Sequence, residues 1–128
     1  MKKISTLTIA SLLVVGAYST PAQASDQVTT AICGYVESDH KSRLRDQLRS
    51  NKIKLKKVYN RISCDGQSLL RYAMVKDADS VGSFIAKRLS AKMLTTPEAD
   101  GTTIYDWAQA NGKGASATAG AIKDRAKL

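Results

Sequence analysis

The sequence has few of the residues from which catalytic and metal sites are built. It contains one histidine, His40, and two cysteines, Cys33 and Cys64, which are not in a C-x-x-C arrangement. Zinc sites usually need more such ligands at closer spacing. The chain also has neither a G-x-S-x-G nucleophile motif nor a glycine-rich phosphate-binding loop. We therefore predict that the protein is not an enzyme and needs no cofactor or metal.

Long hydrophobic runs are also scarce, and the only candidate lies at the N-terminus. An apolar segment from Ile4 to about Tyr18 follows a basic start and precedes Ala22-Gln23-Ala24, an A-x-A cleavage pattern. These are the three regions of a secretory signal peptide, and the run is too short for a comfortable membrane span. An uncleaved N-terminal anchor is the alternative. We expect residues 1–24 to be a signal peptide and residues 25–128 a single small domain in the periplasm, without a transmembrane span.

The two cysteines both lie beyond the expected cleavage site. An even pair of cysteines in an oxidising compartment indicates a disulfide first of all, here between Cys33 and Cys64. Closing a loop of about thirty residues would stabilise the domain by roughly 3–4 kcal/mol. A reactive thiol or a metal ligand is the alternative.

Positive charge outweighs negative charge, and its distribution is uneven. The formal net charge is +9, and between residues 41 and 61 Asp46 is the only acid. This basic run is either a solvated surface or a site for an anionic partner, such as lipid headgroups, lipopolysaccharide phosphates or an acidic protein face. Tyr59 is its only aromatic residue, so nucleic acid is an unlikely partner. The basic run consists of Lys41, Arg43, Arg45, Arg49, Lys52, Lys54, Lys56, Lys57 and Arg61.

Apolar residues recur at three- and four-residue steps in several segments, which predicts an all-α fold. The second helix should be a surface helix with only Leu44 and Leu48 directed inward, and Asp39 should cap it. Residues 51–63 are expected to form a long connection with some helix, or a short edge strand guarded by lysines. Residues 93–97 are expected to be a connection. The predicted helices cover about residues 25–39, 39–50, 68–76, 79–89, 103–111 and 116–126.

One sequence string occurs twice. Asp65-Gly66-Gln67-Ser68-Leu69-Leu70-Arg71-Tyr72-Ala73 returns about 35 residues later as Asp100-Gly101-Thr102-Thr103-Ile104-Tyr105-Asp106-Trp107-Ala108. A weaker match in the other direction, at an offset of 37, places Ala73 on Val36. The recurrence predicts about three stacked helix-turn-helix units, with an ordinary helical bundle as the alternative. The strings resemble the D-G-x-T-x-L-x-x-A pattern that opens each ankyrin repeat, and the resemblance implies a degenerate ankyrin-like stack.

A second resemblance extends over most of the chain beyond residue 24. Ile32-Cys33, the basic connection, the Cys64–Ala73 string and Val81-Gly82-Ser83 are similar to a family of small exported Gram-negative proteins, catalogued only as a domain of unknown function. The resemblance implies export and paired cysteines, and it supplies no activity or ligand. We expect a non-enzymatic, exported helical-repeat module that binds an envelope protein. The alternative is a charge-driven binder of anionic envelope components, namely lipid headgroups or lipopolysaccharide.

Overall fold

The computed structural model describes residues 21–128, with side chains from Asp26 onward. Residues 1–20, most of the predicted signal peptide, lie outside the described residues. The described chain is helical, as its apolar periodicity predicts, and no helix in it is long and apolar enough to cross a membrane. Its elements are α1 (Pro21–Glu37), α2 (Lys41–Ser50), α3 (Leu55–Val58), the 3₁₀ helix η1 (Tyr59–Arg61), α4 (Leu69–Val75), α5 (Asp79–Arg88), α6 (Ala91–Thr95), α7 (Ile104–Ala110) and α8 (Ala117–Ala126).

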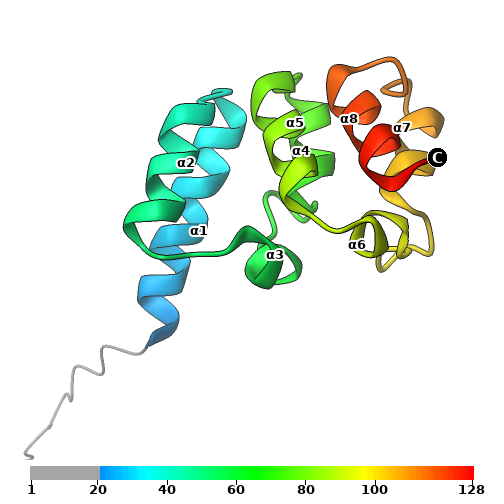
Figure 1. Ribbon diagram of the computed structural model, residues 1–128. Coiled ribbons are helices and arrows are strands. Elements are labelled where there is room, and N and C mark those ends of the chain that lie inside the picture. Colours follow the sequence, from blue (N-terminus) through cyan, green and yellow to red (C-terminus); the bar gives the residue numbers. More distant parts are fainter. Residues whose placement is uncertain (1–20) are drawn as a thin grey trace, which may run out of the picture.

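Consecutive helices pair into hairpins that lie side by side (Figure 1). The helix α1 packs on α2, α4 packs on α5, and α7 packs on α8. The middle hairpin contacts both others, because α4 touches α1 and α7 while α5 touches α2 and α8. The short helices α3 and α6 lie along one edge, within the connections between hairpins. The middle hairpin therefore holds the other two together.

The hydrophobic core follows the contacts between hairpins. Ile32 of α1, Leu70 of α4 and Ile122 of α8 have no exposed surface. Leu44 and Leu48 are the buried residues of α2, which confirms the narrow inward stripe predicted for this helix. Since a surface helix is held by such a stripe alone, the rest of α2 is free to carry charge.

The same turn closes all three hairpins. In each, a residue in the left-handed conformation follows the first helix, namely Asp39, Asp77 and Gly112. The next amide then donates to a carbonyl five residues earlier, as in a Schellman C-cap. The bonds run from His40 N to Tyr35 O (2.9 Å), from Ala78 N to Ala73 O (2.8 Å) and from Lys113 N to Ala108 O (2.7 Å).

These bonds fix which residues are equivalent in the three hairpins. Ala73 and Ala108 accept equivalent bonds, in agreement with the offset of 35 between the two strings. Ala73 is equivalent to Tyr35, whereas the weaker sequence match placed it on Val36. That match was wrong by one residue because the first hairpin has no Asp-Gly turn before its first helix to set the register.

Two predicted connections contain helix. The segment 51–63 forms α3 and η1, so the edge-strand alternative is wrong. Residues 93–97 were expected to be a connection, but most of α6 lies there. Its N-cap Ser90 accepts a hydrogen bond from Met93 N at 3.2 Å, and Leu94 is fully buried. Such a short helix depends on its cap and on burial, because five residues are too few for helix propensity to act.

The predicted cap of α2 was also wrong. Asp39 has a φ of 56° and makes no cap at that helix. Its carboxylate instead accepts a hydrogen bond from Val81 N, in the first turn of α5, at 2.8 Å. Asp79 in turn accepts from Thr118 N and Oγ1, in the first turn of α8, at 3.4 and 3.3 Å. The aspartates therefore cap the next hairpin rather than their own.

Candidate functional site

A disulfide joins Cys33 and Cys64, in agreement with the predicted pairing, with an S–S distance of 2.05 Å and a Cα–Cα distance of 5.7 Å. Cys33 lies on α1, and Cys64 begins the turn that precedes α4. This turn is tight: Cys64 and Gln67 exchange backbone hydrogen bonds of 2.8 and 2.9 Å, and Asp65 and Gly66 both have positive φ. Asp-Gly suits such a two-residue turn. The disulfide therefore links the first hairpin to the start of the second.

Arg71 makes the equivalent tie between the second and third hairpins. Its Nη1 and Nη2 lie 2.7 and 3.0 Å from the two carboxylate oxygens of Asp100, and its Nε pairs with Glu98. Nη2 also donates to the carbonyl of Thr102 at 3.2 Å, and the guanidinium lies 5.2 Å from the Trp107 ring centroid. Bidentate pairing of this kind is directional and strong for a side chain that is only 11% exposed.

A cavity of about 710 Å³ lies beside Arg71, lined also by Tyr59, Ser68 and Glu98. Hydrogen bonds from Arg71 and Thr102 hold the pKa of the Asp100 carboxyl well below its usual range. Burial raises the pKa of the Tyr59 phenol, whose oxygen accepts a long bond of 3.4 Å from Leu70 N. Because Arg71 forms ion pairs with both Glu98 and Asp100, this cluster links the second hairpin to the third.

A second hollow, of about 550 Å³, lies between α2, the segment 53–56 and α5. Leu48, Ile53, Leu55 and Phe84 supply its apolar surface. Five cations and no described carboxylate line it. We call this hollow the basic groove; its cations are Arg45, Arg49, Lys54, Lys56 and Arg88.

The helix period explains how the basic groove forms. Arg45 and Arg49 lie one turn apart on α2, on the same side of the inward stripe. Lys54 and Lys56 flank the buried Leu55. On α5, Arg88 lies one turn after Phe84, and its guanidinium carbon is 4.6 Å from the ring centroid. Three segments thus place cations around one apolar floor.

The charges of the basic groove are poorly neutralised. Arg49 pairs with Asp46 at 2.7 Å, but both side chains are more than half exposed. Exposed pairs of this kind contribute little, about 0–1 kcal/mol. Within residues 26–128, no ion pair involves Arg45, Lys54 or Lys56. The groove therefore concentrates positive charge beside apolar side chains, and the resulting electrostatic potential attracts anions.

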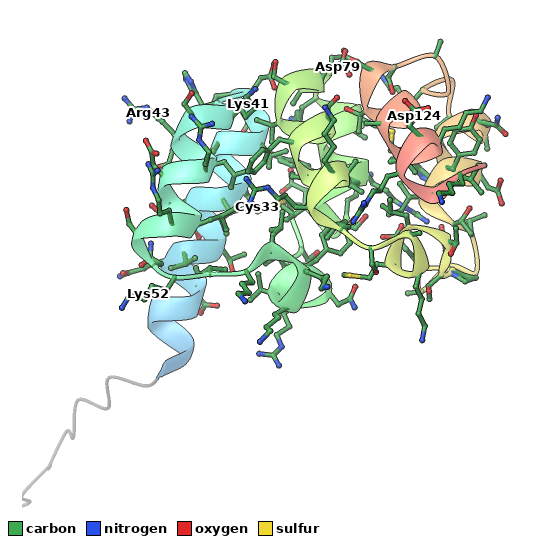
Figure 2. The ribbon with its side chains drawn as sticks, viewed as in Figure 1. Cys33, Lys41, Arg43, Lys52, Asp79 and Asp124 are labelled. Atoms are coloured by element: carbon green, nitrogen blue, oxygen red, sulfur yellow. A yellow bond between two sulfur atoms is a disulfide. The ribbon has the colours of Figure 1, made fainter. Side chains whose placement is uncertain are left out.

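The predicted basic residues are all exposed, but the structure brings only some of them together. Four of the nine line the groove. Lys41 lines an adjacent hollow of about 340 Å³ that shares Phe84 with the groove, and Arg61 lines a hollow beside α1 that shares Ile53 with it. Arg43 on α2 and Lys52, just after this helix, extend away from the other hairpins (Figure 2). Lys57 lines none of these hollows.

Sequence reasoning missed two cations of this surface, Lys87 and Arg88, which end α5. Lys87 lines the hollow next to the groove, and Arg88 lines the groove itself. The available signal was the four-residue step from Phe84 to Arg88, which is typical of neighbours on one helix face. It could not show that this face meets α2, because that contact is set by tertiary packing.

The cations and apolar side chains of the basic groove have the chemistry of a binding surface. His40 is exposed at the N-terminus of α2 and makes no side-chain capping bond. Among the described residues, no group of three or more His, Cys, Asp or Glu side chains is placed to hold a metal ion. What the surface offers is a hollow with cations around an apolar floor.

These features define an all-α domain built of helical hairpins, with one disulfide and a basic groove. The chain belongs to the family described as "Protein of unknown function (DUF3718)", whose model matches residues 32–96. The match contains both cysteines and every residue that lines the basic groove, and it ends before the acids that pair with Arg71. No curated protein and no solved structure matches the chain.

Proposed function

We propose that this protein is an exported, non-enzymatic binding module of the Gram-negative envelope that attaches to another envelope protein. The basic groove is the observation that carries this proposal, because five cations around an apolar floor have no carboxylate in the described lining to balance them. A purely solvating surface has no need to gather charge from α2, the segment 53–56 and α5 around one hollow.

Export to the periplasm is part of the proposal. Its support is the basic start, the apolar run and the A-x-A pattern of the first 24 residues, together with the Cys33–Cys64 pair. Intact mass measurement on protein recovered from a periplasmic fraction is the test. We expect a chain that begins at Ser25 and carries no free thiol. A full-length chain retained in the membrane fraction would overturn this part.

We further propose that the hairpins are degenerate ankyrin-like repeats. The shared Schellman turns and the recurrence of the Asp-Gly string support this reading. Repeat stacks bury the apolar faces of neighbouring units and commonly leave an extended surface for partners. An experimental structure tests this directly: the rotation that superposes the first hairpin on the second should also superpose the second on the third.

A pull-down from an envelope extract tests the proposed binding. The tagged protein is compared with an Arg45→Glu/Arg88→Glu variant and with a control, Lys123→Glu/Lys127→Glu, that changes the net charge equally on α8 and the C-terminal end. We expect the wild type and the control to retain the same partner protein, and the groove variant to lose it. Failure of all three to retain a specific protein over a range of salt concentrations would contradict the proposal.

A second candidate function, charge-driven binding to anionic lipid headgroups or lipopolysaccharide, is favoured by the cations outside the groove. Arg43, Lys52 and Lys57 are exposed and line none of the hollows described above, so they are free to meet a flat surface. Each cation near an anionic membrane contributes about 1 kcal/mol. Co-sedimentation with anionic vesicles or lipopolysaccharide tests this candidate. It is wrong if replacing Lys52, Lys54, Lys56 and Lys57 by Gln leaves binding and its salt dependence unchanged.

A further inference from the structure

We infer that the basic groove receives an acidic peptide segment of the partner, with carboxylates on the groove's cations and an apolar side chain on its floor. The inference deepens the proposed function and rests on it. It concerns the chemistry of the occupant, which the proposed function leaves open.

The positive charges of the groove favour a ligand that carries carboxylate groups. Three of its five cations are arginines, and two of these, Arg45 and Arg88, face the hollow from opposite helices, α2 and α5. A guanidinium offers a planar fork of donors that matches a carboxylate, while a lysine acts as a mobile point charge. No described carboxylate lines the groove to compete with a ligand for them.

The apolar floor of the groove favours a ligand that also has an apolar side chain between its carboxylates. Leu48 and Leu55 are buried beneath it, while Ile53 and Phe84 are half-buried and face the hollow. A ligand that only neutralised the positive charge would leave these apolar side chains in contact with water. A volume of about 550 Å³ accommodates a few side chains of a chain segment.

A membrane surface fits the groove less well than a peptide does. The apolar floor is recessed, whereas an amphipathic protein that lies on a bilayer inserts protruding apolar side chains. Among the described residues, the exposed large hydrophobic side chains are Val75 and Leu128, and neither lines the groove. Nucleic acid is disfavoured as well, because the single aromatic ring of the groove, Phe84, lies against Arg88 and offers no stacking platform.

Binding of a labelled peptide tests the inference. The probe is a fluorescein-labelled peptide of alternating glutamate and leucine, titrated with the purified protein and followed by fluorescence anisotropy. Two matched peptides replace every glutamate by glutamine or every leucine by serine. Vesicles of phosphatidylglycerol are measured in parallel.

We expect the glutamate–leucine peptide to bind more tightly than either matched peptide, and more weakly as salt rises. Arg45→Glu/Arg88→Glu should weaken binding by about tenfold or more, since it places like charges against the ligand. The Lys123→Glu/Lys127→Glu control should bind as the wild type does. Unchanged melting temperatures for both variants would show that each is folded.

Two results would overturn the inference. One is equal affinity of the wild type and the groove variant for the glutamate–leucine peptide. The other is vesicle binding that requires Arg45 and Arg88 while the peptide does not bind. If the pull-down partner depends on the groove but the peptide fails to bind, the occupant is wrong and the proposed function stands. If neither the retention of the pull-down partner nor the binding of the peptide depends on the groove, the inference and the proposed function are both wrong.

Discussion

Single side chains form the junctions between hairpins. Arg71 on α4 reaches Glu98 and Asp100, which precede α7, while Asp39 and Asp79 each accept hydrogen bonds from the first turn of a helix in the following hairpin. A carboxylate at such a position satisfies free amides and also meets the positive end of the helix. Polar residues here therefore hold separate units together, rather than only ending helices.

Replacing Asp100 by asparagine tests the Arg71 junction through pH. Arg71 lowers the pKa of this carboxyl in the folded state, so its stabilising effect is complete above the unfolded pKa of about 4 and is lost as pH falls toward the folded value. We expect wild type to melt higher than Asp100→Asn by a constant margin between about pH 5 and pH 7, and by a shrinking margin below about pH 4. Circular dichroism melts would measure it. A margin unaffected by acid would argue against the ion pair.

At the residue scale, sequence reasoning can assign a cap only to the helix that directly follows it in the chain. Thr103, which directly precedes α7, caps that helix, with its hydroxyl accepting from Asp106 N at 3.2 Å. Asp39 was assigned to its own hairpin because the pattern rule considers only neighbours in sequence. The true partner, Val81 N, is distant in sequence and becomes visible only when the hairpins are packed.

At the scale of the helices, the close contact between α5 and α8 depends on a glycine, Gly82, which has no side chain. A Cβ atom placed on Gly82 would lie 2.1 Å from Thr118 Oγ1, and Thr118 is fully buried. The two helices can therefore approach each other only if residue 82 is glycine. This gives a physical reason for the glycine in Val81-Gly82-Ser83, one of the strings that carried the family resemblance.

Gly82→Ala should lower the free energy of unfolding by about 1–3 kcal/mol, the usual range for overpacking. The matched control is Gly120→Ala on α8, where a Cβ has nothing within 4 Å and helix propensity should raise stability by about 0.5–1 kcal/mol. Urea denaturation would measure both. Thr118→Ala should recover part of the loss in the Gly82→Ala background. Equal effects of the two alanines would refute the close contact.

The junctions also correspond between hairpins. Cys33 lies two residues before Tyr35, and Arg71 lies two residues before Ala73, the equivalent residue of the next hairpin. Each is thus at the same place on the first helix of its hairpin, and each bonds to the turn before the following hairpin. One junction is covalent and the other is ionic. The sequence offset missed this correspondence because its register for the first hairpin was wrong by one residue.

Across the whole molecule, the basic run lies on α2 and the segment that follows it, where Figure 2 labels Lys41, Arg43 and Lys52. The basic groove spans the junction between the first and second hairpins. The sequence showed the run of cations from Lys41 to Arg61 but not the groove, because Phe84 and Arg88 come from α5. The disulfide stabilises this junction, since Cys33 is on the first hairpin and Cys64 precedes the second.

Removal of the disulfide should therefore cost stability and leave the fold intact. Cys33→Ser/Cys64→Ser should lose about 3 kcal/mol, which corresponds to a melting temperature lower by roughly 10–20 °C. Reductant should lower the melting temperature of the wild type to the same value and leave the variant unchanged. A wild type that melts identically with and without reductant would contradict this role for the bond.

The most direct test of the central claim is site-specific photocrosslinking in intact cells. A photoreactive amino acid replaces Lys54 in the basic groove or, as the control, Lys123 on α8, and adducts are identified by mass spectrometry. The proposed function predicts an adduct with an envelope protein at position 54 and none at position 123, with the crosslinked peptide rich in acidic residues. The absence of a protein adduct at position 54, or equal adducts at both positions, would contradict it.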